Sequence, residues 1–228
     1  EPVCMQYAQQ AIKERLYKAL EMSQVTKGHV NLTCQETNRE LALEASRDGR
    51  HATIDLSSAS DLVDFNLAIR MFDSHPDLQG AIRACRSTRA MLPDGKVITL
   101  RKFASMGSAL CFPVEAMYFY TICIVALLKK HDLPVTFRNC YRVSRDVYVF
   151  GDDIIVPTDT AEVVSDYLQR YNCKVNTSKS FASGKFRESC GMDAFDGVEV
   201  TPTYIREVPP RDKQSAKQII SWVKTANH

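Results

Sequence analysis

The sequence of 228 residues lacks the signatures of several protein classes. It contains no CxxC or HxxxH spacing, so a zinc site is not expected. Its longest apolar stretch, residues 117–128, is too short to span a bilayer, and nothing at Glu1 resembles a signal peptide. Eight cysteines are present but scattered, which favours reduced, mostly buried thiols in a reducing compartment over a disulfide framework. The sequence therefore predicts a soluble, intracellular protein without a membrane partner.

Charge and composition leave the class of partner open. The formal net charge of +2 permits nucleic-acid binding without demonstrating it, because a small total can conceal a local basic groove. A hydrophobic content of 45% and a charged content of 25% are typical of a globular chain that can bury a sizeable core. Since internal repeats, low-complexity tracts and Gly/Ser linkers are lacking too, we expect one interlocked unit.

Hydrophobic periodicity predicts alternating helices and strands. The first helix is expected to bury a stripe that begins at Tyr7, and the arginine-rich stretch 138–145 is interpreted as a polar loop. The order favours an α+β fold, with a mainly antiparallel sheet and helices packed on one of its faces. We expect helices over residues 4–24, 62–72, 108–130, 160–172 and 211–225, and strands within 51–57, 92–100, 148–157 and 174–205.

Two adjacent aspartates interrupt an apolar, β-branched run in YVFGDDIIVP, residues 148–157. Gly151 permits a sharp turn between two strands, so Asp152 and Asp153 are expected to project from its tip. Asp55 closes the strand HATID and can reach the same point from a neighbouring strand. Three converging carboxylates would repel one another unless divalent cations lie between them, and oxygen-only ligands suit Mg²⁺. Two such ions can activate an attacking hydroxyl and stabilise a leaving oxyanion.

A lone GDD tripeptide is usually a solvated turn, so its surroundings decide its meaning. Here both flanks are strand-like, and the segments HATIDLSSASD, LPDGKVITLRKFASMGSA, VYVFGDDIIVP and NTSKSFASGKFRESCGMDAFDGVEVTPTYIR occur in that order. Together they resemble the RNA-dependent RNA polymerases of positive-strand RNA viruses, and most closely the Qβ-like replicase β-subunits of the single-stranded RNA bacteriophages. The resemblance covers most of residues 1–206, and the FRESCG core is specific to the phage branch.

The resemblance implies a right-hand polymerase palm that performs template-directed RNA synthesis from ribonucleoside triphosphates. It implies that Asp55, Asp152 and Asp153 are catalytic and hold two Mg²⁺ ions, for which Mn²⁺ can substitute. The argument from strand geometry converges independently on the same three residues.

The resemblance also assigns residues to the nucleotide. Asp61 matches the acid that helps to recognise the ribose, although an aspartate at a helix start is an equally good account. Ser105 and Gly107 resemble the small-residue loop beneath template and nucleotide, with a simple helix-entry turn as the alternative. Glu115 departs from the asparagine that many viral polymerases use to sense the 2′-hydroxyl, because an ionised glutamate accepts that hydrogen bond but cannot donate one.

Basic residues complete the expected site. Lys179 resembles the family's general acid, which protonates departing pyrophosphate, although a lysine beside serines is more often a solvated surface charge. Arg187 matches a strand that supports the growing RNA, with a structural pairing to Glu188 as the safer alternative. The arginines of 138–145 could contact phosphates, which would make RNA binding depend on salt, or could simply be surface charges.

The resemblance divides the chain into three parts. Residues 1–50 are expected to be a fingers-derived segment, 51–206 the catalytic palm with motifs A to E, and 207–228 the start of a thumb or a C-terminal helix. Fingers and thumb are expected to be largely absent, so the isolated fragment need not be active.

The partners implied are template RNA, nascent RNA, ribonucleoside triphosphates and, by resemblance, bacterial elongation factors Tu and Ts, in the host cytoplasm. Two alternatives stay open. A reverse transcriptase or another palm-type nucleotidyltransferase would differ in its use of deoxynucleotides. A non-catalytic RNA-binding palm module would bind RNA without metal-dependent turnover.

Overall fold

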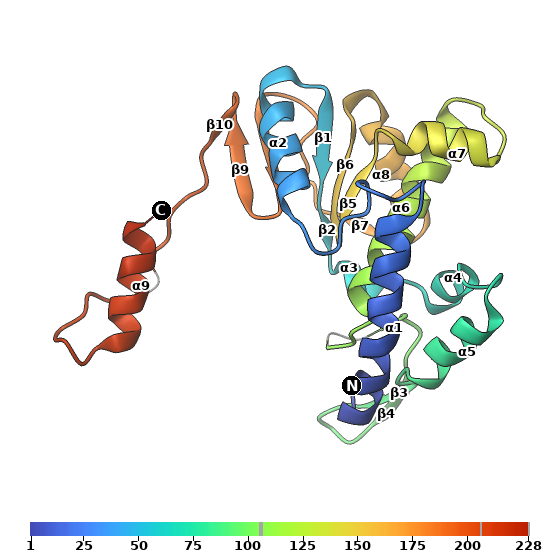
Figure 1. Cartoon of the computed structure of the whole chain (residues 1–228), viewed down its shortest axis with the longest axis horizontal. Helices are drawn as coiled ribbons and strands as arrows, with labels where there is room; N and C mark the ends of the chain where they lie inside the picture. The colour runs from blue at the N-terminus through green and yellow to red at the C-terminus, as the bar shows by residue number, and fades with distance from the viewer. Residues whose placement is uncertain (105–106, 206, 228) are drawn as a thin grey trace.

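A computed structural model describes residues 1–104, 107–205 and 207–227. Its centre is a three-stranded antiparallel sheet in the order β1-β6-β5, formed by β1 (His51–Ile54), β5 (Tyr148–Phe150) and β6 (Asp153–Pro157) (Figure 1). Ile54 lies opposite Ile154 in the first pair, and Phe150 lies opposite Asp153 in the second. The two expected strands of 148–157 and the bend at Gly151 are therefore confirmed.

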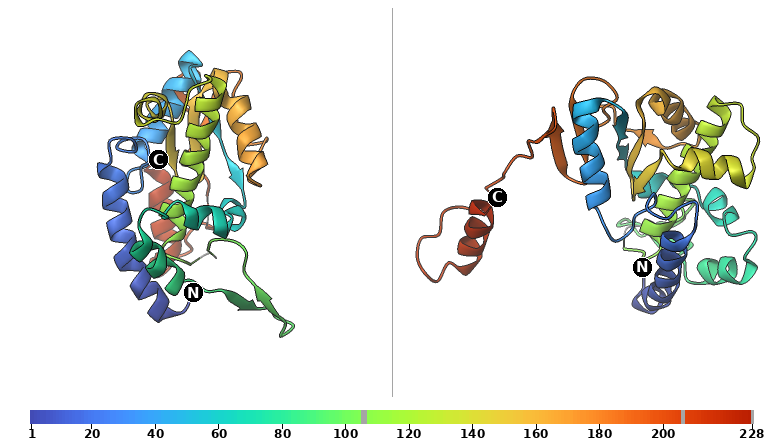
Figure 2. Two further views of the ribbon diagram at one scale, coloured as in Figure 1. Left: turned by 90° about the vertical axis from the view of Figure 1, so that its right-hand side faces the viewer. Right: turned by 45° about the horizontal axis from the view of Figure 1, so that its top comes forward.

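Helices cover both faces of this sheet. Helix α2 (Glu36–Asp48) packs on one face, whereas α6 (Cys111–Lys130) and α8 (Ala161–Arg170) pack on the other (Figures 1 and 2). The expectation of helices on a single face is thus wrong. The physical reason lies in β6, where three successive apolar side chains, Ile154, Ile155 and Val156, are all buried. A strand without alternation between apolar and polar residues needs cover on both sides.

Helix α6 is the central element of the core. Thirteen of its residues are buried, and Pro113 lies in its first turn, where a missing amide hydrogen costs little. Among the described residues it is the one helix that is long and apolar enough to cross a membrane, but 72% of its most apolar window is buried inside the protein. This burial is typical of a core helix.

Three smaller sheets surround the centre. The hairpin of β3 and β4, drawn in green, projects from the body (Figure 2), and its turn at Asp94-Gly95 agrees with the sequence. Gly197 supplies a left-handed conformation between β9 and β10. The pairs are β2 (Leu56–Ser57) with β7 (Lys174–Val175), β3 (Arg89–Met91) with β4 (Val97–Thr99), and β8 (Phe186–Ser189) with β9 (Met192–Phe195), which also pairs with β10 (Val198–Glu199).

Three details differ from the sequence-based expectation. Tyr7 is 83% exposed and not part of a buried stripe. The helix expected over 62–72 is split, because Asp64 caps a new helix by accepting a hydrogen bond from the backbone N–H of Leu67. The arginine-rich stretch is helical. The remaining helices are α1 (Val3–Met22), α3 (Ala59–Leu62), α4 (Phe65–Arg70), α5 (Pro76–Ala84), α7 (Phe137–Ser144), the 3₁₀ turn η1 (Thr158–Thr160) and α9 (Ala216–Ala226).

The C-terminal helix α9 stands apart from the body, at the end of an extended segment (Figure 1). In the described part of the chain it has no buried residue, and its apolar Ile220 and Val223 are more than half exposed. All eight cysteines lie in the described residues and are free, as the sequence predicts. They are less buried than expected: three are buried, three are half-buried, and Cys4 and Cys34 are exposed.

Candidate active site

The turn between β5 and β6 presents the paired aspartates. Gly151 has φ of +62°, a left-handed conformation that favours glycine. A Cβ atom on Gly151 would lie 2.5 Å from Cε2 of Phe112. Phe112 is itself packed edge-on against Phe150, with ring centroids 5.1 Å apart. The turn is therefore tight for two independent reasons, and Asp152 and Asp153 occupy a defined position.

The structure brings Asp55 to the same edge of the sheet. Asp55 follows β1 directly, and continuing the β1–β6 register places it opposite Asp153. Electrostatics show the same proximity. Burial raises the pKa of Asp152, Asp153 and Asp55 raise it further, and Lys179 lowers it. The three acids and the lysine that the sequence predicts as a site therefore form one electrostatic cluster.

Two donors from the β8–β9 turn hold Asp153. The Ser189 hydroxyl and the Cys190 backbone N–H both donate to Oδ1 of Asp153, at 3.3 and 3.2 Å. Burial raises the pKa of Asp153, and these two donors counteract that rise. The Cys190 N–H reaches the carboxylate because Cys190 adopts a left-handed φ of +50°.

A second segment holds Asp55. Nδ2 of Asn176 donates to Oδ2 of Asp55 at 2.7 Å, and the backbone N–H of Asp55 donates to Oγ of Ser180 at 3.1 Å. Asn176, Ser180 and the Ser189–Cys190 donors were not predicted as site residues. Their place inside NTSKS and FRESCG, two of the segments that carry the family resemblance, was the signal that could have identified them.

Glu115 lies on α6, on the core side of the acid cluster. It is 8% exposed, and burial, together with the charge of Asp152, raises its pKa to about 7. Its Oε2 accepts a weak hydrogen bond from Sγ of Cys111 at 3.6 Å. A carboxyl with this pKa is partly protonated near neutral pH, so it can donate a hydrogen bond as well as accept one.

A further carboxylate, Glu188, faces the cluster from β8. Burial raises its pKa, Asp153 raises it further, and Lys179 lowers it. The sequence suggested Glu188 only as a partner for Arg187, but the two charges that act most on its pKa are Asp153 and Lys179 of the acid cluster. Lys179 is exposed on its loop and acts on both Asp152 and Glu188.

The residues expected to contact the nucleotide are placed as follows. Asp61 lies in α3 and is paired with Nζ of Lys102 at 2.5 Å. Gly107 has φ of +92°, and its carbonyl accepts a hydrogen bond from Nε2 of Gln6 at 2.6 Å. Ser105 lies outside the described residues. Of these residues, Asp61 raises the pKa of the Cys111 thiol, which in turn donates to Glu115.

Arg187 is not placed to contact RNA. It is 1% exposed, and its Nε donates to the carbonyl of His51 at 2.7 Å. Nη1 donates to the carbonyls of Gly184 and Phe186, at 3.0 and 2.7 Å. The expected contact of Arg187 with growing RNA is therefore wrong. Its role is structural, because the buried guanidinium joins β8 to β1. Pairing with Glu188 is not the reason, since the acid that acts on Arg187 is Asp48.

The acid cluster is the candidate metal centre. Within residues 1–104, 107–205 and 207–227, no group of three or more His, Cys, Asp or Glu side chains is drawn together closely enough to hold an ion. The chemistry of the donors nevertheless fits a hard divalent cation, because they are carboxylate oxygens, and burial and neighbouring carboxylates raise the pKa of Asp152 and of Asp153.

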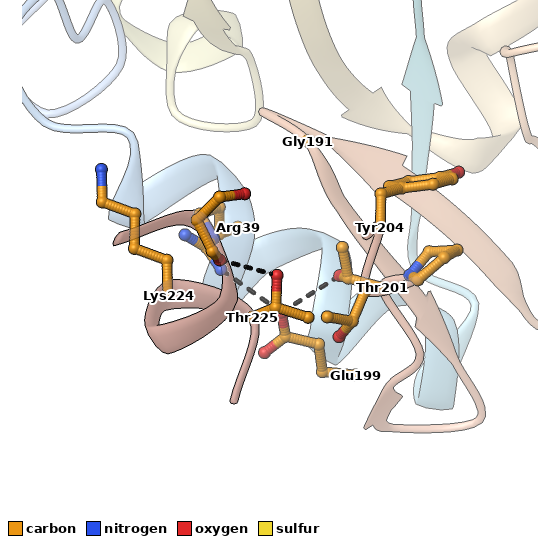
Figure 3. A pocket seen from close by; sticks show the side chains of 10 residues that line it. Arg39, Gly191, Glu199, Thr201, Tyr204, Lys224 and Thr225 are labelled. Carbon is orange, nitrogen blue, oxygen red and sulfur yellow. Dashed lines mark hydrogen bonds and ion pairs between the residues drawn. The ribbon is translucent and has the colours of Figure 1, made fainter. Parts of the chain in front are cut away.

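A cavity of about 700 Å³ lies elsewhere, between α9 and the segment that follows β10 (Figure 3). Arg39 and Lys224 line it, and Arg39 is paired with Glu199 at 3.4 Å. The acid cluster does not line this cavity, so the two features are separate.

Comparison with known proteins identifies the family. The family described as "RNA replicase, beta-chain" matches residues 1–213. The chain is 37% identical over 195 residues to the RNA-directed RNA polymerase beta chain of Enterobacteria phage fr, covering 86% of this chain and 33% of the relative. It is 36% identical over 191 residues to that of Escherichia phage MS2, covering 84% and 32%. The Escherichia virus Qbeta subunit is 35% identical over 185 residues, covering 80% and 29%.

Solved structures agree at the level of the fold. Telomerase from Candida albicans, in complex with a TWJ fragment of telomeric RNA, aligns with a TM-score of 0.60 at 11% identity, covering 96% of this chain and 41% of that chain. Apo telomerase from Candida tropicalis aligns at 0.55 and 14% identity, covering 97% and 44%. The fold is therefore polymerase-like, with mixed helix and sheet. The chain spans about a third of the length of the curated relatives it matches. By its family match and these identities, the chain belongs to the RNA replicase β-chain family of the RNA bacteriophages.

Proposed function

We propose that this chain supplies the catalytic palm of a phage replicase, which synthesises RNA on an RNA template from ribonucleoside triphosphates. The observation that carries the proposal is the cluster at the β5–β6 turn, where the strand register places Asp55 opposite Asp153 and where the charges of Asp55, Asp153 and Lys179 act on the pKa of Asp152. The cluster belongs to a chain that is 35–37% identical to three RNA-directed RNA polymerase subunits.

Asp55, Asp152 and Asp153 would hold divalent cations, with Mg²⁺ as the expected metal and Mn²⁺ as a substitute. Two bound ions would lower the pKa of the primer 3′-hydroxyl and neutralise charge on the triphosphate. The protein's own part is positioning. Ser189 and Cys190 fix the direction of the Asp153 carboxylate, and the tight turn at Gly151 fixes Asp152. In this proposal the exposed Nζ of Lys179 donates a proton to the departing pyrophosphate.

Glu115 is proposed to contact the ribose. Its raised pKa supports this role, because a protonated carboxyl donates a hydrogen bond to the 2′-hydroxyl and an ionised one accepts from it. Asp61 is assigned to the sugar as well, with Lys102 as its present partner. Ser105 and Gly107 are assigned to the loop beneath the nucleotide.

Template RNA, nascent RNA and ribonucleoside triphosphates are the proposed partners, and the bacterial host cytoplasm is the proposed location. Elongation factors Tu and Ts are proposed as host partners from the family resemblance alone. Residues 1–50, 51–206 and 207–228 are proposed as fingers-derived, palm and thumb-side segments. The helix α9, which stands apart from the body, supports a separate role for the third segment.

The test is Asp152→Asn in the complete, active replicase. Loss of a carboxylate that binds the metal should reduce RNA synthesis by more than about 100-fold, because mutating a residue that only hydrogen-bonds to a metal ligand already reduces metal affinity or activity by about 10–100-fold. Asp166→Asn is the matched control, because it removes the same charge from an exposed aspartate of α8, which is paired with Arg170 at 2.6 Å. Normal Mg²⁺-dependent synthesis by Asp152→Asn would refute the proposal. Preference for deoxynucleotides would reassign the enzyme as a reverse transcriptase.

A further inference from the structure

The segment 176–180 closes around Asp55 after leaving β7. The backbone N–H of Asn176 donates to the carbonyl of Asp55 at 2.9 Å, and its side-chain Nδ2 donates to Oδ2 of the same residue at 2.7 Å. On the other side of the loop, Ser180 Oγ accepts from the backbone N–H of Asp55 at 3.1 Å. Asp55 is therefore held by backbone and side chain together.

The amide of Asn176 is itself oriented. The hydroxyl of Ser178 donates to Oδ1 of Asn176 at 2.7 Å. Because an amide oxygen accepts and an amide nitrogen donates, this contact turns Nδ2 toward the carboxylate of Asp55. Ser178 thus donates to Asn176, and Asn176 donates to Asp55. Hydrogen-bonded partners behind metal-binding groups commonly set their direction in this way.

Asn176 also anchors the turn that carries Lys179. The backbone N–H of Lys179 donates to the carbonyl of Asn176 at 3.1 Å. The charge of Lys179 in turn lowers the pKa of Asp152 and of Glu188, so the lysine lies within electrostatic reach of the cluster. One residue therefore contacts both an acid of the cluster and the loop of the proposed general acid.

We infer that Asn176 is a positioning residue, which directs the Asp55 carboxylate toward the divalent cation and keeps the Lys179 loop in register with it. The inference rests on the proposed function of the acid cluster. Nδ2 of Asn176 donates to Oδ2 of Asp55, so Oδ1 would be the oxygen left to bind a cation. A neutral amide suits this task, because it adds a donor without adding a charge that would compete with the cation.

The test measures Mn²⁺ binding to the complete replicase by electron paramagnetic resonance, without nucleotide. Asn176→Ala should weaken Mn²⁺ binding about 10-fold, the effect typical of a partner behind a ligand. Ser178→Ala should weaken it by a smaller factor, because the amide stays but loses its orientation. Thr177→Ala is the matched control, since Thr177 is an exposed residue of the same turn, and it should bind Mn²⁺ like the wild type.

Each outcome has a defined meaning. Unchanged Mn²⁺ binding in Asn176→Ala, with an unchanged melting temperature, would overturn the inference. If Asn176→Ala fails to fold, the exposed Ser178→Ala variant decides, and wild-type binding in that variant would overturn the inference. Asp152→Asn distinguishes a failure of this inference from a failure of the proposed function. If it abolishes RNA synthesis while Asn176→Ala binds Mn²⁺ normally, only this inference fails, whereas active Asp152→Asn would remove the proposed function beneath it.

Discussion

Replacing Gly151 by alanine tests how tightly the β5–β6 turn is built. The left-handed φ of +62° costs an alanine about 1–2 kcal/mol. The added Cβ would also lie 2.5 Å from Cε2 of Phe112, and overpacking of this kind costs about 1–3 kcal/mol. Phe112 cannot withdraw freely, because it packs edge-on against Phe150. We therefore expect Gly151→Ala to lower the free energy of unfolding by about 2–5 kcal/mol.

Gly95→Ala separates the two contributions. Gly95 also ends a hairpin turn and has φ of +83°, but a Cβ atom there would meet nothing within 4 Å. Gly95→Ala should therefore show only the conformational cost of about 1–2 kcal/mol. Urea denaturation of the wild type and the two variants gives the difference between them. RNA synthesis by the complete replicase should fall in Gly151→Ala, because Asp152 moves with the turn, and stay normal in Gly95→Ala.

Equal destabilisation by the two substitutions would refute the reasoning. It would mean that Phe112 yields without cost and that the turn is not fixed by packing. Normal RNA synthesis by Gly151→Ala, at the expected loss of stability, would show instead that the position of Asp152 does not limit the reaction.

Two further substitutions test buried charges. Arg187→Met leaves the carbonyls of His51, Gly184 and Phe186 without their donor, so urea denaturation should show a free energy of unfolding lower by about 2–4 kcal/mol. RNA affinity, measured by filter binding, should stay unchanged. A loss of RNA affinity without a loss of stability would show that Arg187 contacts RNA after all. Folding raises the pKa of Glu115 from 4.5 to about 7, so between these pH values the folded chain binds more protons than the unfolded chain. The free energy of unfolding should therefore fall by up to about 3 kcal/mol as the pH rises from 4.5 to 7. Urea midpoints in EDTA should show this decline in the wild type and not in Glu115→Gln; parallel pH profiles would contradict it.

The sequence predicts the local features of this fold well. The bend at Gly151 and the helix that contains Pro113 follow from residues close together in the chain. Asp55 could be assigned to the cluster because strand geometry limits where the end of a neighbouring strand can lie. The family resemblance selected the same acids independently.

Features that depend on distant partners were not predictable in this way. Arg187 was expected to support the growing RNA or to pair with Glu188, yet carbonyls from β1 and from its own strand satisfy its guanidinium in the interior. The bond from Asn176 to Asp55 spans 121 positions of the chain, and no periodicity encodes such a pairing. The arginine-rich stretch was taken for a loop because its composition is polar. Its helix begins at a cap, where Thr136 accepts from the backbone N–H of Asn139.

The rigidity of the acidic turn and its raised pKa values have one physical origin. Covering β6 on both faces fixes Ile154 and Ile155 in the core, and it also withdraws the adjoining carboxylates of Asp152 and Asp153 from water. Hydrogen bonds from the β8–β9 turn offset part of that cost for Asp153, and Lys179 offsets part for Asp152. Both pKa values nevertheless remain raised, so this edge of the sheet retains a preference for additional positive charge. An edge of the sheet that is held in place and short of positive charge favours a cation, in line with the metal centre proposed above, and the described side chains must still draw closer together to hold one.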